Sequence, residues 1–133
     1  MTGGPLTESI VVDFKHFNKI KKIGKTFAIV EPGVYYRDFE KKAKKKGLLF
    51  PSYPASKNLC AWGGMVSNNA GGEKTLAYGK TEDYIQELKV ILADGQQYTF
   101  KDLNKTELAK KIKQQDFEGR VYKRMYSLIK NNK

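Results

Sequence analysis

The segment GGMVSNNAGGEKTLAYG, residues 63 to 79, constrains the fold of this chain more than any other feature of its sequence. It places five glycines and two adjacent asparagines among few bulky side chains, so it adds little to a hydrophobic core. Glycine inside a helix or strand is also destabilising, because its backbone loses the most conformational freedom on folding. Two explanations remain: the glycines form turns, or they let a ligand approach the backbone closely.

The order of residues in this segment predicts a short helix. The apolar pair Met65-Val66 stands between two glycine pairs, and one turn of helix from 64 to 69 accounts for the spacing. We expect Gly71 or Gly72 to end this helix in a left-handed conformation. The free N–H groups at a helix start suit an anionic group such as a pyrophosphate, although Gly-Gly turns are also common without any ligand.

Glycine, proline and small hydroxyl residues gather in three other loops, which are TGGPLTES (2 to 9), EPGV (31 to 34) and PSYPAS (51 to 56). Each of these loops alone is typical of a turn. Together with the first segment, they give four loops with special backbone requirements on one small domain. Such a set suits an extended ligand that lies across the ends of several strands.

Apolar runs predict the strands. SIVVDF (9 to 14) is rich in β-branched residues, and KTFAIVEPG (25 to 33) is a second such run, ended by its proline and glycine. Residues 85 to 100, IQELKVILADGQQYTF, alternate apolar and polar side chains on either side of Asp94-Gly95. A run of this kind around Asp-Gly is a strong signal for a β-hairpin.

Helical periodicity follows the second strand and returns after the hairpin. Tyr36, Phe39 and Ala43 share one face of a helix that Gly47 ends, and from Lys105 onward two helices meet near QQDFEG. The element order predicts an α+β fold with a mainly antiparallel sheet and flanking helices. We divide the chain into a core of residues 1–100 and a helical extension or insertion of residues 101–133.

The composition excludes several classes of site. With one cysteine, Cys60, and one histidine, His16, the chain lacks the residues for an internal disulfide, a Cys/His metal site or a Cys–His nucleophile. No apolar run approaches the roughly 20 residues of a membrane-spanning helix, and no signal-peptide pattern opens the chain. We therefore expect a cytoplasmic protein in a reducing setting, with no membrane partner.

The net charge of +11 is unevenly distributed. Residues 1–46 and 101–133 each carry +6, whereas residues 47–100, which include the glycine-rich segment, carry −1. The excess is nearly all lysine, in runs such as KKAKKK (41 to 46). Basic binding patches tend to mix arginine and aromatic residues into such runs, so we interpret these lysines as the solvated side of a helix.

The loops and strands follow one another in an order that resembles a known family. TGGPLTESIVVDF, AIVEPGV, GLLFPSYPAS and the run from WGG to LADG are similar to the FAD-binding domain of FAD-linked oxidases. That family includes vanillyl-alcohol oxidase, p-cresol methylhydroxylase and the D-lactate dehydrogenase and glycolate oxidase group. Each motif alone is weak, whereas the ordered set over residues 2 to 100 is specific.

The resemblance implies FAD as the cofactor and the fold of the second FAD-binding subdomain of the vanillyl-alcohol oxidase type. In that family FAD lies between two α+β subdomains, and a glycine-rich loop holds its pyrophosphate, largely through backbone atoms. The residues that match the family's cofactor-binding motifs are Thr2, Gly3, Gly4, Pro5, Leu6, Thr7, Pro54, Ser56, Gly63, Gly64, Val66, Asn69, Gly71 and Gly72.

Three positions depart from the family pattern. Ala61-Trp62 stands where the family usually has Thr-Ile, which removes a hydroxyl donor and inserts a large ring. This ring is expected either to stack on the flavin or adenine or to pack in the core. Ala77 replaces an arginine that often precedes the Tyr-Gly pair, and His16 lies outside the places where the family attaches flavin covalently.

The resemblance also lacks parts that the family needs for activity. The match begins midway through the pyrophosphate loop, and neither the return strand after the hairpin nor a substrate domain with a catalytic base follows. We expect a fragment of a flavin-dependent oxidoreductase, of the 2-hydroxy acid dehydrogenase or oxidase type, that is inactive alone. Its partners would be FAD, the first FAD subdomain and the substrate domain, and we expect no catalytic residue and no metal ligand within it.

Two alternatives belong to other functional classes. A lysine-rich, non-enzymatic module would bind nucleic acid or another anion, with a steep dependence on salt. A stand-alone structural or interaction domain would keep the fold without any cofactor. In that case changing Gly64 or Gly71 would alter stability but no ligand affinity.

Overall fold

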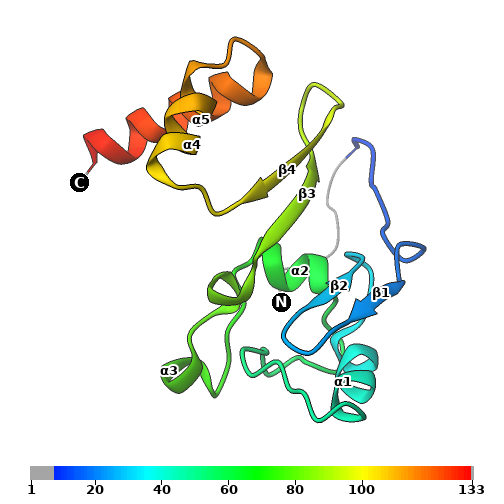
Figure 1. Ribbon diagram of the computed structural model, residues 1–133. Helices are drawn as coiled ribbons and strands as arrows, with labels where there is room; N and C mark the ends of the chain where they lie inside the picture. The colour runs from blue at the N-terminus through cyan, green and yellow to red at the C-terminus, as the bar shows by residue number, and fades with distance from the viewer. Residues whose placement is uncertain (1–7, 133) are drawn as a thin grey trace. The chain divides into compact units, whose positions relative to one another are not determined.

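The computed structural model describes residues 8–132, and the chain divides into two compact units, Met1–Tyr84 and Ile85–Lys133 (Figure 1). We call them unit 1 and unit 2 and describe each by itself. The described residues form helices and two antiparallel two-stranded sheets, which confirms the predicted α+β class. The predicted division into a cofactor-binding core, 1–100, and a helical extension, 101–133, is a division by function. It differs in kind from these compact units and stays a prediction. None of the described helices is long and apolar enough to cross a membrane.

Unit 1 consists of a β-hairpin followed by short helices and long connecting loops. Its elements are β1 (Ile20–Ile23), β2 (Ala28–Val30), α1 (Tyr36–Lys44), α2 (Trp62–Ser67), α3 (Thr75–Tyr78) and the 3-10 helix η1 (Thr81–Tyr84). Strands β1 and β2 pair antiparallel, with an irregularity in register between Ile20 and Lys22.

The core of unit 1 is aromatic and forms around α1. Its buried apolar residues are Val34, Tyr36, Phe39, Ala43, Tyr53, Trp62 and Met65. The predicted face of α1 supplies three of them, so that prediction is confirmed. Gly47, at φ 69°, follows the helix in the left-handed conformation that glycine tolerates best.

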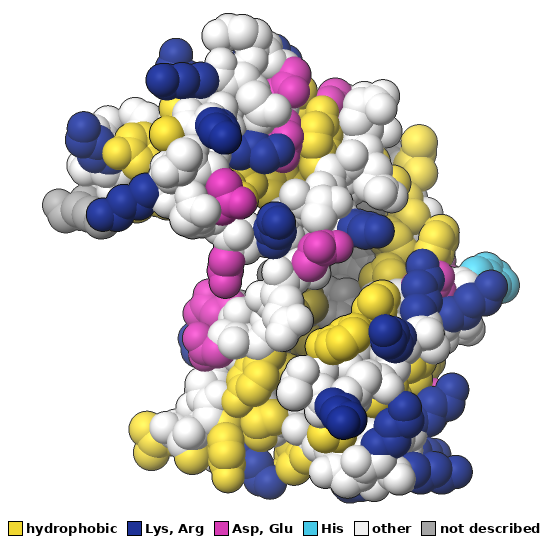
Figure 2. Space-filling model, viewed as in Figure 1, with side chains coloured by type: hydrophobic (Ala, Val, Ile, Leu, Met, Phe, Trp, Pro, Cys, Tyr) yellow, Lys and Arg dark blue, Asp and Glu magenta, His cyan; other side chains and the backbone are white. Residues whose placement is uncertain are grey.

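The lysine run of α1 lies on the opposite side of the helix. Lys41, Lys42 and Lys44 to Lys46 are all exposed. Figure 2 shows Lys and Arg side chains over the part of unit 1 that holds β1 and α1. This arrangement agrees with the interpretation of the run as a solvated helix face.

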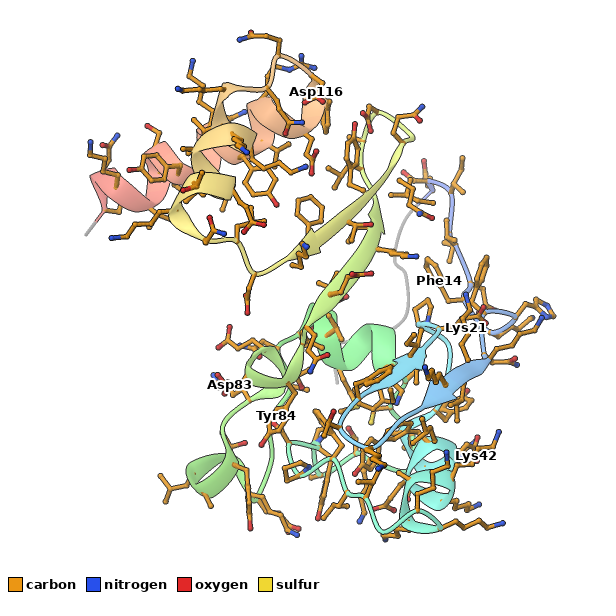
Figure 3. The ribbon with its side chains drawn as sticks, in the orientation of Figure 1. Phe14, Lys21, Lys42, Asp83, Tyr84 and Asp116 are labelled. Atoms are coloured by element: carbon orange, nitrogen blue, oxygen red, sulfur yellow. The ribbon has the colours of Figure 1, made fainter. Side chains whose placement is uncertain are left out.

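The strand predicted at residues 9–14 is wrong. Residues 9–14 form no strand and belong to neither described sheet, and Ile10, Val11 and Val12 are exposed. The segment ends in a turn in which the Phe17 N–H donates to the Phe14 carbonyl, and Phe14 is labelled in Figure 3. The partner of β2 is instead β1, whose two central lysines hide the strand pattern in the sequence.

Unit 2 contains the predicted hairpin and the two predicted helices. Its elements are β3 (Glu87–Ile91), β4 (Gln97–Lys101), α4 (Lys105–Lys113) and α5 (Phe117–Asn131). Gly95 has φ 76° in the turn, as the Asp-Gly signal predicts. Two aromatic pairs join the hairpin to the start of α5, Tyr98 with Phe117 and Phe100 with Tyr122, at ring-centroid distances of 6.5 and 5.8 Å.

Candidate functional site

Most glycines of the glycine-rich segment lie against the protein's own chain. A Cβ on Gly63 would lie 2.8 Å from the Cβ of Pro32, and one on Gly72 would overlap the carbonyl oxygen of Tyr53. A Cβ on Gly71 would overlap Oγ1 of Thr75. These three glycines therefore allow segments of unit 1 to pack closely. This packing accounts for glycine at the three positions without any ligand.

Gly64 is different from the other glycines that the structure describes. It lies in α2 without a positive φ, and a Cβ placed on it meets no described atom within 4 Å. A glycine inside a helix is destabilising by about 0.5–1 kcal/mol relative to alanine. The packing of residues 8–132 does not require glycine here, so this position is the one that leaves backbone open for an external group.

The free N–H groups expected at the start of α2 are partly occupied, which corrects that prediction. The Trp62 N–H donates to the Val34 carbonyl at 2.9 Å, and the Gly63 N–H donates to the Pro32 carbonyl at 2.8 Å. Tyr35 and Ala61 form an isolated antiparallel bridge beside them. The first turn of this short helix is thus a packing contact with the loop at residues 31–34, and it does not provide a complete anion site.

The predicted end of α2 is also wrong in its detail. The left-handed residue is Asn69, at φ 45°, and neither Gly71 nor Gly72 has a positive φ. Asparagine tolerates this conformation because its short side chain can form local hydrogen bonds. Here Asn69 Oδ1 accepts a hydrogen bond from the Glu82 backbone N–H at 3.0 Å, which ties the end of α2 to η1.

The structure brings some of the candidate cofactor residues together. Pro54 lies beside Gly72, since a Cβ on that glycine would be 3.1 Å from the Pro54 Cα. Ser56 begins a turn whose carbonyl oxygen accepts hydrogen bonds from two backbone N–H groups, and Val66 is half-buried in α2. The candidates Thr2, Gly3, Gly4, Pro5, Leu6 and Thr7 lie outside the described residues.

Trp62 packs in the core of unit 1. Its side chain is only 7% exposed, and its ring contacts Phe39 and Phe50 edge-on at centroid distances of 4.9 Å. Its Nε1–H is buried without a hydrogen-bond partner among residues 8–132. Of the two alternatives expected for this ring, the structure shows packing in the core.

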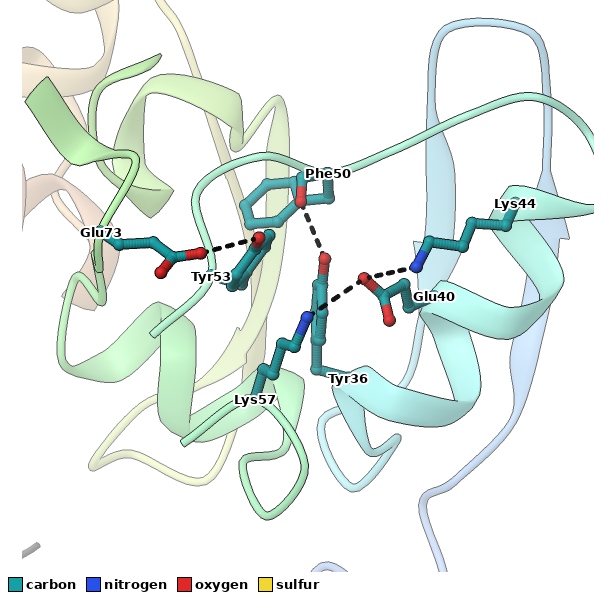
Figure 4. A network of polar contacts seen from close by, with 7 residues as sticks. All are labelled: Tyr36, Glu40, Lys44, Phe50, Tyr53, Lys57 and Glu73. Carbon is teal, nitrogen blue, oxygen red and sulfur yellow. Dashed lines mark hydrogen bonds and ion pairs between the residues drawn. The ribbon is translucent and has the colours of Figure 1, made fainter. Parts of the chain in front are cut away.

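Polar contacts flank candidate residues 54–56 and 69–72 along the chain, at Tyr53, Lys57 and Glu73 (Figure 4). The Tyr53 hydroxyl donates to Glu73 Oε1 at 3.3 Å, and Lys57 Nζ lies 3.8 Å from Glu40 Oε1. That same carboxylate oxygen of Glu40 also pairs with Lys44 at 3.2 Å. The Lys57–Glu40 ion pair connects the loop after Tyr53 to α1, and the Tyr53–Glu73 hydrogen bond connects Tyr53 to the loop after Gly72.

The remaining nucleophilic and metal-binding side chains do not form a second site. Burial raises the pKa of the half-buried Cys60 thiol, which disfavours the reactive thiolate. His16 is exposed, and residues 8–132 contain no group of three His, Cys, Asp or Glu side chains placed to hold a metal ion.

Comparison with known proteins identifies the family. Residues 1–101 match the family described as FAD binding domain. The chain belongs to this FAD binding domain family. The match includes all of unit 1 and the β3–β4 hairpin, so the cofactor of the family is FAD, as the sequence resemblance implied.

Curated relatives of this FAD binding domain are oxidases and dehydrogenases. It is 39% identical over 93 residues to glycolate oxidase subunit GlcD of Bacillus subtilis, covering 68% of this chain and 20% of that protein. It is 33% identical over 98 residues to a D-lactate dehydrogenase of Archaeoglobus fulgidus, covering 71% and 22%. It is 29% identical over 135 residues to a D-2-hydroxyglutarate dehydrogenase of Pantoea ananatis, covering 98% and 13%. The chain thus spans about a fifth or less of the length of these relatives.

The residues present fit FAD at one described place. Gly64 leaves open backbone at the surface of α2, while Gly63, Gly71 and Gly72 hold the neighbouring loops tightly together. An exposed helical glycine of this kind would let an external group such as a dinucleotide approach the backbone closely. Residues 47–100 carry a net charge of −1, so their side chains together add no electrostatic attraction for an anionic group.

Proposed function

We propose that this FAD binding domain is part of an oxidoreductase that oxidises a 2-hydroxy acid, and that it contributes one side of the FAD cleft. The relatives named for glycolate, D-lactate and D-2-hydroxyglutarate support this substrate class, since all three are 2-hydroxy acids. The observation that carries the proposal is Gly64, a helical glycine without a reason in the packing of the described residues.

FAD, when bound, supplies the chemistry by accepting a hydride from the carbinol carbon of the substrate. This chain's residues bind and orient it. Gly64 admits the pyrophosphate to the backbone of α2, with Val66 and Asn69 on the same segment. The other contacts proposed on this chain are Thr2, Gly3, Gly4, Pro5, Leu6, Thr7, Pro54, Ser56, Gly63, Gly71 and Gly72.

The catalytic base and the substrate pocket belong, on this proposal, to the remaining length of the parent protein. Relatives are roughly five times as long as the part matched here, which leaves room for a first FAD subdomain and a substrate domain. The chain alone is then a cofactor-binding part without turnover. A reducing, cytoplasmic setting stays a prediction that rests on the single cysteine.

The Gly64→Ala variant tests the proposal, with Gly64→Leu as its stronger form. Alanine should leave stability unchanged or raise it by about 0.5–1 kcal/mol, because it favours the helix. Both variants should weaken FAD binding, by about tenfold or more for leucine, because the added side chain fills the place of the pyrophosphate. Urea denaturation and FAD fluorescence titration measure the two effects on the same protein.

Two controls separate a lost contact from a lost fold. Gly119→Ala, outside the proposed contacts, should be destabilising by about 1–3 kcal/mol, because its Cβ would overlap the Gln114 carbonyl oxygen. Ala109→Leu adds the same leucine to an exposed position of α4 and should change neither property by much. Unchanged FAD affinity in Gly64→Leu would remove the basis of the proposal.

A further inference from the structure

The dipeptide Ser52-Tyr53 holds both ends of the segment at residues 72–79, which contains α3. At one end, the Tyr53 carbonyl oxygen lies directly against Gly72. At the other, the fully buried Ser52 hydroxyl donates to the Gly79 carbonyl at 2.9 Å. The segment between them projects outward, and Leu76 at its tip is completely exposed.

The Tyr53 side chain adds a second set of contacts to the same segment. It is 7% exposed, and its ring packs on that of Tyr36 at a centroid distance of 5.4 Å. The Nζ atoms of Lys57 and Lys74 lie 4.6 and 5.6 Å from the centroid of the Tyr53 ring. A cation at this distance from an aromatic face is attracted by the ring quadrupole.

These contacts join two candidate cofactor-binding stretches through one buried ring. Lys57 directly follows the Pro54–Ser56 stretch, and Lys74 follows the Gly71-Gly72 pair by two residues. Lys74 has no carboxylate within ion-pair distance among residues 8–132. Its ammonium group instead contacts the Tyr53 ring. Binding is tighter when such stretches are held in place before the ligand arrives.

We infer that Ser52 and Tyr53 are positioning residues for FAD, which hold residues 54–56 and 72–79 in the geometry that the cofactor needs. The inference rests on the proposed function. In this inference neither Ser52 nor Tyr53 contacts FAD. Each acts by holding residues 54–56 or 72–79 in place. Lys74 takes part in the same arrangement, because its ammonium group contacts the Tyr53 ring from the segment at residues 72–79.

The experiment compares Lys74→Met and Ser52→Ala with the matched control Lys22→Met. All variants are made in the full-length protein. Lys22 Nζ lies 5.1 Å from the centroid of the Phe27 ring, so its loss removes a similar contact in the β1–β2 hairpin. Hydrogen exchange is measured at the amides of Thr75, Ala77 and Gly79, which donate within the segment. FAD affinity and urea stability are measured on the same samples.

We expect amide exchange at residues 75–79 to become about two- to fivefold faster in Lys74→Met and about two- to tenfold faster in Ser52→Ala, as the loss of one cation–π contact or one hydrogen bond implies. FAD affinity should fall by a similar factor. Lys74→Arg, which keeps a cation over the ring, should restore both. Lys22→Met should change neither.

The outcomes distinguish this inference from the proposed function. If the unmodified protein binds no FAD, the proposed function fails and the inference fails with it. If the unmodified protein binds FAD and Lys74→Met and Ser52→Ala bind it equally well, the inference alone is overturned. Weaker FAD binding in Lys74→Met without faster exchange also overturns it, because Lys74 would then contact the cofactor directly.

Discussion

Tyr36 shows how one residue ties the core of unit 1 together. Its side chain is fully buried, and its hydroxyl donates to the Phe50 carbonyl at 2.8 Å. Burial raises the pKa of this hydroxyl well above its ordinary value of 10.0, with a smaller contribution from the nearby charge of Glu40. The native state therefore keeps the proton to a higher pH than the unfolded chain does.

This pKa shift gives a prediction for alkaline pH. Below about pH 10 both states hold the proton, and above it only the unfolded state loses the proton, so stability falls as the pH rises. Tyr36→Phe should be less stable than the native protein by about 1 kcal/mol at neutral pH, through the lost hydrogen bond. The difference should shrink above about pH 10, and urea denaturation over a pH series measures it. A difference that stays constant to high pH would show that the hydroxyl titrates normally.

The glycines show what the sequence could and could not predict at single residues. Their crowding predicted close backbone approach, and Gly63 and Gly72 do approach other backbone closely. The sequence could not tell which partner they approach, because Pro32 and Tyr53 lie far from them along the chain. Only three-dimensional packing separates Gly64 from its neighbours.

The predictions for Trp62 and for the end of α2 at Asn69 lacked the same tertiary information. A lone tryptophan gives no periodic signal that distinguishes a core position from a ligand contact. Asn69 took the left-handed position expected for a glycine because the Glu82 N–H offers its side chain a partner across the turn. The sequence places that partner 13 residues away, beyond the range of local rules.

At the scale of elements, helix ends carry the clearest local signals. Asn104 begins α4 with a capping box, in which its side chain accepts from the Glu107 N–H and the Glu107 carboxylate accepts from the Asn104 N–H, both at 2.9 Å. Such reciprocal caps satisfy backbone donors that the helix cannot satisfy itself.

Removing this cap should loosen α4 measurably. We expect Asn104→Ala to be destabilising by about 1 kcal/mol, because the Glu107 N–H loses its acceptor. Lys105→Ala, at the next position, should stay within about 0.5 kcal/mol of the native protein, because it removes no such contact. Urea denaturation followed by far-UV circular dichroism checks both. Equal stability of the two variants would mean that the capping box contributes nothing.

Elements with a regular period were predicted well, and irregular ones were not. The face of α1 and the β3–β4 hairpin follow clear apolar periods. The run at 9–14 has strand composition, but a strand needs a neighbouring strand to pair with, and neither of the two described sheets includes this run. Strand β1 was missed because Lys21 and Lys22 interrupt its apolar pattern.

At the scale of the whole molecule, the family match covers unit 1 and the β3–β4 hairpin of unit 2. The family match ends at residue 101, and α4 and α5 follow it. The exposed apolar residues of the α5 C-terminal half are Met125, Tyr126, Leu128 and Ile129. The matched relatives are several times longer than this chain, and the proposed activity would use parts that correspond to their remaining length.

The measurement that tests the central claim most directly is FAD binding, followed by quenching of flavin fluorescence. It should be made on this chain and on the same chain extended in its own reading frame. The account predicts that the extended chain binds FAD and that this chain binds it much more weakly, because one side of the cleft is missing. If neither chain binds FAD, the glycine-lined surface around Gly64 is not half of a cofactor cleft.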